Sequence, residues 1–220
     1  MISLQHITKT YPVGDGLTVL DDVCLDINEG EYVGILGKSG SGKSTMLHIM
    51  GLLDRPTSGL LSFNGRPVHA LDDRELSELR GSLVGFVFQA FHLVPQLSVS
   101  ENVELPLYYQ RIPRRERRER AAHALEQVGM SARRGHVSSQ LSGGERQRTA
   151  IARALVTEPA LILADEPTGN LDSRTGGDIV ALLERLHGQG RTIVMITHDR
   201  EIASHLPRVV HIRDGRIEGV

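Results

Sequence analysis

The segment "GKSGSGKS", Gly37–Ser44, constrains the fold of this chain more than any other stretch. The residues before it, "YVGILG", form a short apolar run that contains β-branched residues, and "KSTMLHIM" after it has helical spacing. A strand, a glycine-rich loop and a helix in this order begin an α/β unit. The sequence therefore predicts an α/β fold built around this loop.

The loop also has a predicted chemistry, because it fits the pattern G-x-x-x-x-G-K-[ST] with a strand before it and a helix after it. Glycines let the backbone N–H groups turn toward phosphates, Lys43 reaches the β- and γ-oxygens, and the Ser44 hydroxyl can bind Mg²⁺. A chance Gly/Ser loop is the alternative, and the flanking pattern argues against it. ATP is the predicted nucleotide, since nothing in the chain resembles a guanine-reading N-K-x-D loop.

A second acidic segment completes the predicted site. "LILADEP" is an apolar strand that ends in Asp165 and Glu166. A carboxylate at a strand end near a phosphate loop can hold Mg²⁺ through water, and its neighbour can orient or deprotonate the attacking water. We assign the first role to Asp165 and the second to Glu166. A strand-terminal acidic turn without chemistry is the alternative.

The remaining pattern places strands at both ends of the chain. The first third reads as strands with an Asn64-Gly65 hairpin turn, and the last part contains "ALILADE", "TIVMITHD" and an Asp214-Gly215 hairpin. From about Leu71 to Glu158 the pattern is mostly helical. We expect this helical block to be inserted between early and late strands of one sheet.

Composition excludes several function classes. The formal net charge of −2 argues against a nucleic-acid-binding protein that works through a general basic field. The "RRERRER" run is interpreted as a solvated helix face, because Glu116 can pair with Arg120. The longest apolar runs are far below the roughly 20 residues of a membrane span. Cys24 is the only cysteine, so no disulfide or paired-cysteine zinc cluster is expected, and the ten histidines are interpreted as surface or core residues.

With "GKSGSGKS", "LSGGE" and "LADEPTGNLD" together, nearly the whole chain resembles the nucleotide-binding subunit of an ATP-binding-cassette (ABC) transporter. The resemblance implies a RecA-like P-loop NTPase core with an antiparallel β subdomain and an inserted α-helical subdomain. It implies a single domain over 1–220. The core and β subdomain would occupy about 1–88 and 160–220, and the helical subdomain about 89–159.

The resemblance also gives a role to the glycines of "LSGGE". Two subunits would pack head to tail, so that Ser142, Gly143 and Gly144 cap the γ-phosphate held by the partner's loop over 37–45. Asp172 in "GNLD" resembles a residue that crosses this interface. The expected assembly is a homodimer that encloses two ATP.

Three further positions are similar to functional residues of the family. Tyr11 resembles the aromatic that stacks on adenine, and an aromatic that anchors a strand end is the alternative. Gln89 in "FVFQAFHL" resembles the glutamine that senses Mg²⁺ and water. His198 resembles the switch histidine that contacts the γ-phosphate, although a histidine at a strand end is usually structural.

The predicted sets follow from these assignments. The catalytic set is Glu166, His198, Gln89 and Lys43. The Mg²⁺ set is Ser44, Gln89 and Asp165. The nucleotide set is Tyr11, Gly37, Lys38, Ser39, Gly40, Ser41, Gly42, Lys43, Ser44, Thr45, Ser142, Gly143, Gly144 and Asp172.

Two residues depart from the family pattern. Glu145 occupies a signature position where glutamine is commoner, and Lys38 occupies a loop position often held by proline. Lys38 has no clear interpretation from the sequence. Because Glu166 is retained, the pattern predicts an active ATPase.

"GLLDRPTSG", "SVSENVELPL" and "DEPTGNLD" resemble the subgroup of lipoprotein-release, macrolide-export and cell-division ATPases. This implies a peripheral protein at the cytoplasmic face of the inner membrane, which drives a separate permease for export or extraction of a lipoprotein, drug or peptide. The permease would dock in a groove around Gln89–Leu97, whose apolar residues core packing explains equally well. The alternatives are a soluble ABC ATPase of DNA repair or translation and a P-loop kinase, which leaves "LSGGE" unexplained.

Overall fold

The computed structural model describes residues 1–219, which divide into two compact units. The sheet unit comprises Met1–Arg80 and the C-terminal segment from Gly190, and the helical unit comprises Gly81–Gln189. Both units combine helices with strands, in agreement with the predicted α/β class.

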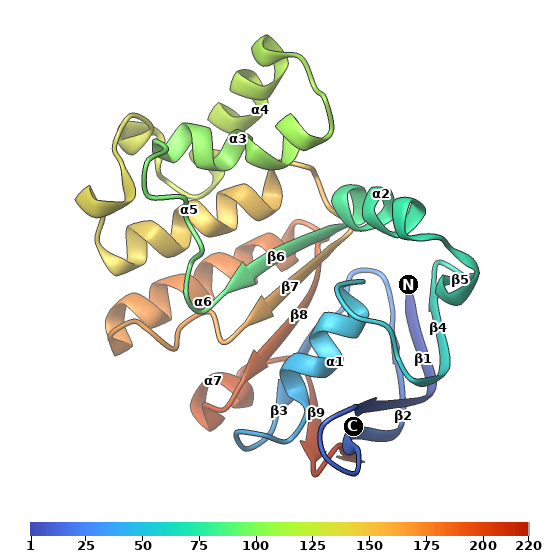
Figure 1. The fold of residues 1–220 in the computed structure, drawn as a ribbon. Coiled ribbons are helices and arrows are strands. Elements are labelled where there is room, and N and C mark those ends of the chain that lie inside the picture. The colour runs from blue at the N-terminus through green and yellow to red at the C-terminus, as the bar shows by residue number, and fades with distance from the viewer. Residues whose placement is uncertain (220) are drawn as a thin grey trace. The chain divides into compact units, whose positions relative to one another are not determined.

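The sheet unit contains a four-stranded antiparallel sheet of order β2-β1-β4-β5 (Figure 1). Its strands are β1 (Ile2–Tyr11), β2 (Leu17–Ile27), β4 (Ser58–Phe63) and β5 (Arg66–Pro67). Val23, Leu25 and Ile27 alternate with exposed residues and are buried, as period-two patterning requires. The predicted Asn64-Gly65 turn joins β4 to β5, and both residues adopt positive φ.

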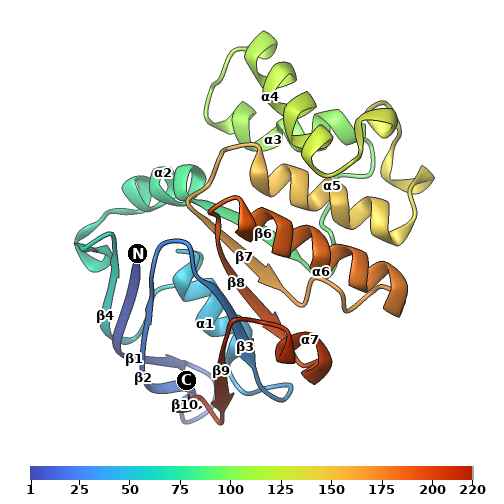
Figure 2. The ribbon, with the colours of Figure 1, turned by 180° about the vertical axis from the view of Figure 1, so that it is seen from behind.

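The same unit contains parallel strands in the order β10-β9-β3-β8, with β10 antiparallel at the edge (Figure 2). These are β3 (Tyr32–Leu36), β8 (Thr192–Thr197), β9 (Arg208–Arg213) and β10 (Arg216–Gly219). Helix α1 (Lys43–Met50) packs against β2 and β8, and α7 (Arg200–Ser204) packs against β3 and β8. Helix α2 (Asp73–Leu83) begins in this unit.

The helical unit contains a strand that the sequence did not predict. Residues Val84–Phe88 form β6, which pairs in parallel with β7 (Leu161–Asp165), although they lie in the stretch predicted as mostly helical. The pattern did not single out this strand because "VGFVF" is a short apolar run between helices, and period alone does not separate a buried strand from a helix segment. The pairing register ends at Phe88 opposite Asp165.

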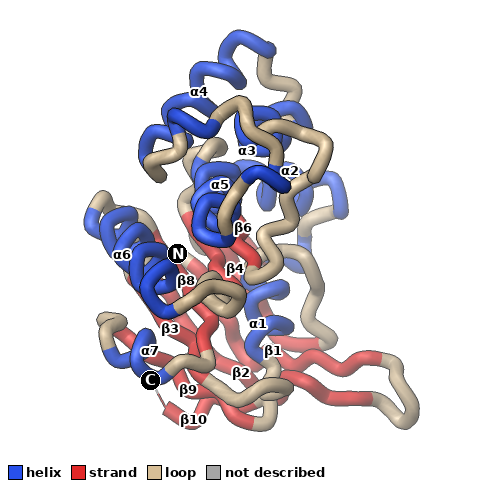
Figure 3. The backbone as a smooth tube through the Cα atoms, turned by 90° about the vertical axis from the view of Figure 1, so that its left-hand side faces the viewer, coloured by secondary structure: helices blue, strands red, loops and turns tan. Residues whose placement is uncertain are grey.

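Four helices complete this unit (Figure 3): α3 (Val99–Tyr109), α4 (Arg114–Gln127), α5 (Gly143–Leu155) and α6 (Ser173–Gly188). Pro113 occupies the position before the first turn of α4, and the predicted Glu116–Arg120 pair forms. Helix α5 packs against β6, α3, α4 and α6, so it is the central helix of the unit.

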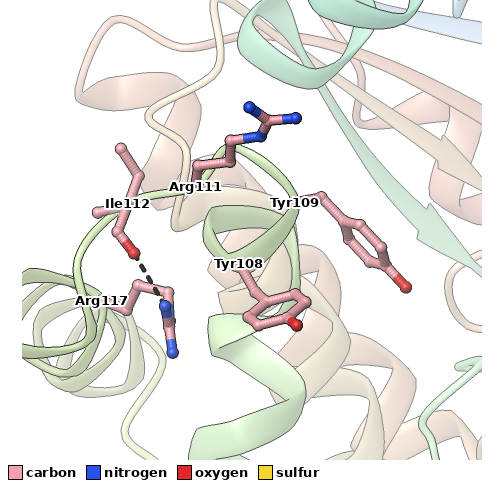
Figure 4. Close-up of a pocket in the computed structure, with 5 residues that line it drawn as sticks. All are labelled: Tyr108, Tyr109, Arg111, Ile112 and Arg117. Carbon is pink, nitrogen blue, oxygen red and sulfur yellow. Dashed lines mark hydrogen bonds between the residues drawn. The ribbon is translucent and has the colours of Figure 1, made fainter.

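The end of α3 borders a surface hollow of about 480 Å³ (Figure 4). Its lining residues are Tyr108, Tyr109, Arg111, Ile112 and Arg117. The Arg117 guanidinium lies over the Tyr108 ring and donates to the Ile112 carbonyl at 2.8 Å. None of the residues predicted to act in nucleotide chemistry lines this hollow.

Candidate functional site

The phosphate loop follows β3 and leads into α1, as the sequence predicts. Gly40 and Gly42 adopt φ values of 78° and 100°, and Gly42 is the residue that precedes the first turn of α1. A Cβ at Gly42 would lie 2.7 Å from the Val19 carbonyl oxygen. Glycine is therefore required at this position both for conformation and for space.

Lys43 is held inside this loop with only 6% of its surface exposed. Its ammonium donates hydrogen bonds of 2.8 Å to the carbonyls of Gly37 and Lys38. The Ser41 hydroxyl is buried and has no hydrogen-bond partner among residues 1–219. A buried cation beside an unpartnered hydroxyl at a helix N-terminus fits an anionic phosphate group.

His198 lies at the same sheet edge as this loop. Strands β3 and β8 pair in parallel register, with Leu36 opposite Thr197. Gly37 and His198 are the residues that follow these two positions. Carboxyl ends of parallel strands are where such folds bind ligands, so the fold brings the predicted histidine to the phosphate loop.

Tyr11 ends β1 and is tied down through its hydroxyl, which donates to the Asp54 carboxylate at 2.8 Å. The Lys9 ammonium lies 4.8 Å from the ring centroid and 2.6 Å from the same carboxylate. Burial pushes the pKa of Asp54 upward, but the hydrogen bonds from Lys9 and Tyr11 outweigh it, so the pKa is lowered. Tyr11 thus anchors the strand end, and its stacking on adenine stays a prediction.

The helical unit positions the acidic pair. Asp165 is the last residue of β7, and Glu166 follows it with a φ of 45°. A glutamate in the left-handed region is uncommon, and such strained residues cluster at functional sites. The Glu166 carbonyl accepts from the Gly169 N–H at 3.0 Å, which closes a tight turn after the strand.

Gln147 of α5 holds this turn and was not predicted from the sequence. Gln147 is fully buried, and its side-chain N–H donates to the Pro167 carbonyl at 2.7 Å. Its side-chain oxygen lacks a partner within the described part of the chain. The available signal was a polar residue on the apolar stripe that continues through Ala150, Ile151 and Ala154.

Gln89 follows β6 and lies beside the turn that follows β7. Its amide contacts the Asn170 side chain at 3.3 Å, and Asn170 donates back to the Gln89 carbonyl at 2.9 Å. A Cβ at Gly169 would come within 2.6 Å of the Gln89 amide nitrogen. The fold therefore brings Gln89 to the turn that begins at Glu166.

The "LSGGE" turn packs against the loop that contains Asp172. Ser142 caps α5, and a Cβ at Gly144 would lie 2.5 Å from a Thr175 side-chain carbon. Asp172 caps α6 by accepting from the Thr175 N–H and hydroxyl, and these hydrogen bonds lower its pKa. The small residues of the signature turn thus permit contact with the start of α6.

The departure at Glu145 has a structural explanation. Its carboxylate accepts from the Ser142 N–H at 2.8 Å to complete a capping box, and it also pairs with Arg133 at 2.9 Å. A glutamine could make the first contact but not the charged second one. The hydrogen bonds from Ser142, with that from Arg133, hold the pKa of Glu145 below its ordinary value of 4.5.

Comparison with known proteins decides the family. The model of the family described as "ABC transporter" matches residues 20–169. The chain belongs to the ABC transporter family. It is an ATP-binding and ATP-hydrolysing cassette of the type found in ABC transporters, and a soluble ATPase of another pathway is not favoured.

Full-length relatives and solved cassettes agree with this assignment. The chain is 50% identical to an uncharacterized ABC transporter ATP-binding protein, YknY, of Bacillus subtilis over 99% of this chain and 95% of the relative. It is 54% identical to the macrolide export ATP-binding/permease protein MacB of Rhodospirillum rubrum, and it spans 33% of that longer protein.

The dimeric structure of the bacterial ABC transporter cassette MJ0796 matches with a TM-score of 0.91 at 46% identity, over 100% of this chain and 97% of that one. Another MJ0796 dimer, also with a TM-score of 0.91, is a post-hydrolysis state bound to ADP and Pi. These matches confirm the predicted RecA-like P-loop fold class and the subgroup resemblance. No helix in the described residues is long and apolar enough to cross a membrane.

The ABC cassette's Glu145–Arg133 pair yields a pH-dependent prediction. Because the folded-state pKa of Glu145 is lowered, its contribution to stability is complete above pH 4.5 and is lost as the pH falls through the folded pKa. Glu145→Gln should therefore reduce the free energy of unfolding by up to about 1 kcal/mol at pH 7 and by less at pH 3.

Urea unfolding of both proteins at the two pH values measures this difference. Glu184→Gln, on α6, is the matched control. If Glu145→Gln lowers the free energy of unfolding by the same amount at both pH values, the charged contact with Arg133 does not contribute as described.

Proposed function

We propose that two copies of this chain pack head to tail around two ATP molecules and drive a separate membrane permease. The ATP-binding part of this proposal rests on the buried Lys43 ammonium beside the unpartnered Ser41 hydroxyl at the start of α1. The dimeric cassette MJ0796 supports the assembly, because it matches this chain over its whole length.

In each subunit the phosphate loop binds the β- and γ-phosphates. Lys43 supplies a positive charge where negative charge develops during transfer, and the loop N–H groups supply aligned dipoles. Tyr11 stacks on the adenine with the ring face that Lys9 leaves open. His198 contacts the γ-phosphate from the neighbouring strand end.

Ser44 of the phosphate loop, with Gln89 and Asp165 of the helical unit, would supply the ligands of a Mg²⁺ ion, which prefers oxygen donors and keeps several waters. Such an ion would supply positive charge that offsets the negative charge of the phosphates. Glu166 accepts a proton from the attacking water. The oxygen of this water bonds to the γ-phosphorus as the bond between that phosphorus and the ADP oxygen breaks. The Gln147 contact to the Pro167 carbonyl fixes the turn that presents Glu166.

The signature turn acts on the ATP held by the partner copy. Ser142 presents its hydroxyl and the N-terminal N–H groups of α5, which form an anion-binding helix start. Gly143 and Gly144 leave room for a close approach of the γ-phosphate. Asp172, whose carboxylate is fixed by Thr175, crosses the interface and couples the two sites.

The subgroup indicates the direction of transport. Two relatives are named for macrolide export and pyoverdine export. We assign this chain to export or extraction of a lipoprotein, drug or peptide, at the cytoplasmic face of the inner membrane. The substrate contacts belong to the permease.

The segment Gln89–Leu97 is the docking surface for that permease. Arg153 donates from α5 to the carbonyls of Phe91 and His92, and Asn102 bonds the backbone of Val94 and Leu97. These contacts fix the backbone, while 37% of the Val94 side chain stays exposed. A rigid loop that presents an apolar side chain suits a partner helix.

The in-trans role of Ser142 is tested by two linked substitutions. Glu166→Gln should slow hydrolysis by roughly 10²–10⁴-fold, the usual contribution of a general base, so ATP accumulates between two subunits and holds them as a dimer. Adding Ser142→Arg places a long cation at the turn and should prevent the dimer. Nucleotide binding by the monomer should persist, because the phosphate loop is unchanged.

Light scattering with ATP and Mg²⁺ measures the mass, and fluorescent-nucleotide titration measures binding. Ser131→Arg in the Glu166→Gln background is the control, since it adds the same charge at another exposed serine of the helical unit. A Glu166→Gln, Ser142→Arg protein that still dimerises with ATP would refute the role in trans.

The docking surface is tested separately. Val94→Glu should reduce by at least about tenfold the amount of the integral membrane protein that co-purifies with the tagged chain, because a charge must be desolvated at the contact. Basal ATPase activity should be unchanged. Leu60→Glu, on the exposed face of β4, is the control and should leave co-purification intact. If Val94→Glu and Leu60→Glu recover the same amount of the integral membrane protein, Gln89–Leu97 is not the docking surface.

A further inference from the structure

Three metal-ligating side chains gather on the antiparallel sheet of the sheet unit, apart from the phosphate loop. His6 comes from β1, and Asp22 and Cys24 come from β2. All three are exposed, and their ligand atoms lie within 4.8 Å of one another. Elsewhere in residues 1–219 no second group of three histidine, cysteine or carboxylate ligands meets this spacing.

The strand geometry explains how these residues meet. Asp22 and Cys24 alternate with the buried Val23 and Leu25, so both face away from the core. Opposite them, the β1 register shifts between Leu4 and Ile7, which adds a residue to that strand. His6 lies in this bulge with a φ of 53°. The bulge turns the imidazole to the face that carries Asp22 and Cys24.

The distances are close to those of a metal centre. His6 Nδ1 lies 2.7 Å from Asp22 Oδ1 and 3.8 Å from Cys24 Sγ. Tetrahedral zinc with its usual bond lengths separates a nitrogen from an oxygen ligand by about 3.4 Å and from a sulfur ligand by about 3.6 Å. Small side-chain rotations would therefore bring all three ligands to bonding distance.

A backbone contact also fixes the position of the cysteine sulfur. The His6 N–H points at Cys24 Sγ with a nitrogen–sulfur distance of 3.2 Å. This contact holds the sulfur atom on the same side of the strand pair as the His6 imidazole and the Asp22 carboxylate. A surface His6–Asp22 ion pair alone explains neither this contact nor the position of the thiol.

We propose that His6, Asp22 and Cys24 bind one divalent transition-metal ion of borderline softness, represented here by Zn²⁺. The ligands are His6 Nδ1, one Asp22 oxygen and Cys24 Sγ, and water completes the coordination. The Cys24 thiol loses its proton on binding, so affinity rises with pH. The thiolate and imidazole disfavour Mg²⁺, which separates this site from nucleotide chemistry.

Metal binding at this site joins β1 to β2. A ligand that binds the folded state alone raises its stability by mass action, so Zn²⁺ should raise the melting temperature of the wild-type chain. Both strands precede the phosphate loop, and β1 carries Tyr11 at its end. The metal therefore stabilises the sheet that anchors this tyrosine.

The test uses the nucleotide-free chain with Co²⁺ as a spectroscopic probe and Zn²⁺ in calorimetric titration. The wild type should bind one ion per chain and show the intense near-ultraviolet band of a cobalt thiolate. Cys24→Ser should lose this band, and its Zn²⁺ affinity should fall at least about tenfold. His6→Asn should show the same loss of affinity, with a side chain that tolerates positive φ.

Two controls isolate the site. His69→Asn changes an exposed histidine outside the cluster and should bind Zn²⁺ as the wild type does. Lys43→Ala alters the phosphate loop and should also retain Zn²⁺ binding. Wild-type Zn²⁺ affinity in the Cys24→Ser and His6→Asn proteins, or a cobalt spectrum without a thiolate band in the wild type, would overturn the proposal.

Discussion

The buried ammonium of Lys43 is the interaction on which the phosphate loop depends. A charge with 6% exposure is costly unless it is hydrogen-bonded, and the Gly37 and Lys38 carbonyls supply two bonds. These bonds close the loop around the position where phosphate is proposed to bind. Gly42 at φ 100° then directs the chain into α1, so the loop is organised before nucleotide arrives.

In the helical unit, too, polar side chains hold the backbone of turns and helix ends in place. Gln147 holds the turn after Glu166, Ser142 and Glu145 cap α5, and Asp172 caps α6. Each polar side chain satisfies backbone groups that a turn or helix end leaves open. The proposed in-trans surface is therefore preorganised, and an incoming γ-phosphate would meet N–H groups already in position.

Local signals predicted the phosphate loop and the Asn64-Gly65 turn, because spacing and turn chemistry fix these features over a few residues. Strand β6 was missed because its five residues carry no alternation. Gln147 and the His6–Asp22–Cys24 cluster were missed because their contacts join residues 16 or more positions apart. Lys38 remains exposed, and no contact of its side chain explains it.

Nucleotide titration of Lys43→Met tests the central claim most directly, since methionine keeps the length of the side chain and removes its charge. ATP affinity should fall by at least about 100-fold, because the cation on the β- and γ-phosphates is lost. Urea unfolding without nucleotide checks that the Lys43→Met protein is folded, since the substitution removes a buried charge together with its hydrogen bonds to the Gly37 and Lys38 carbonyls. Wild-type ATP affinity in a folded Lys43→Met protein would show that the Lys43 ammonium does not hold the phosphates of ATP.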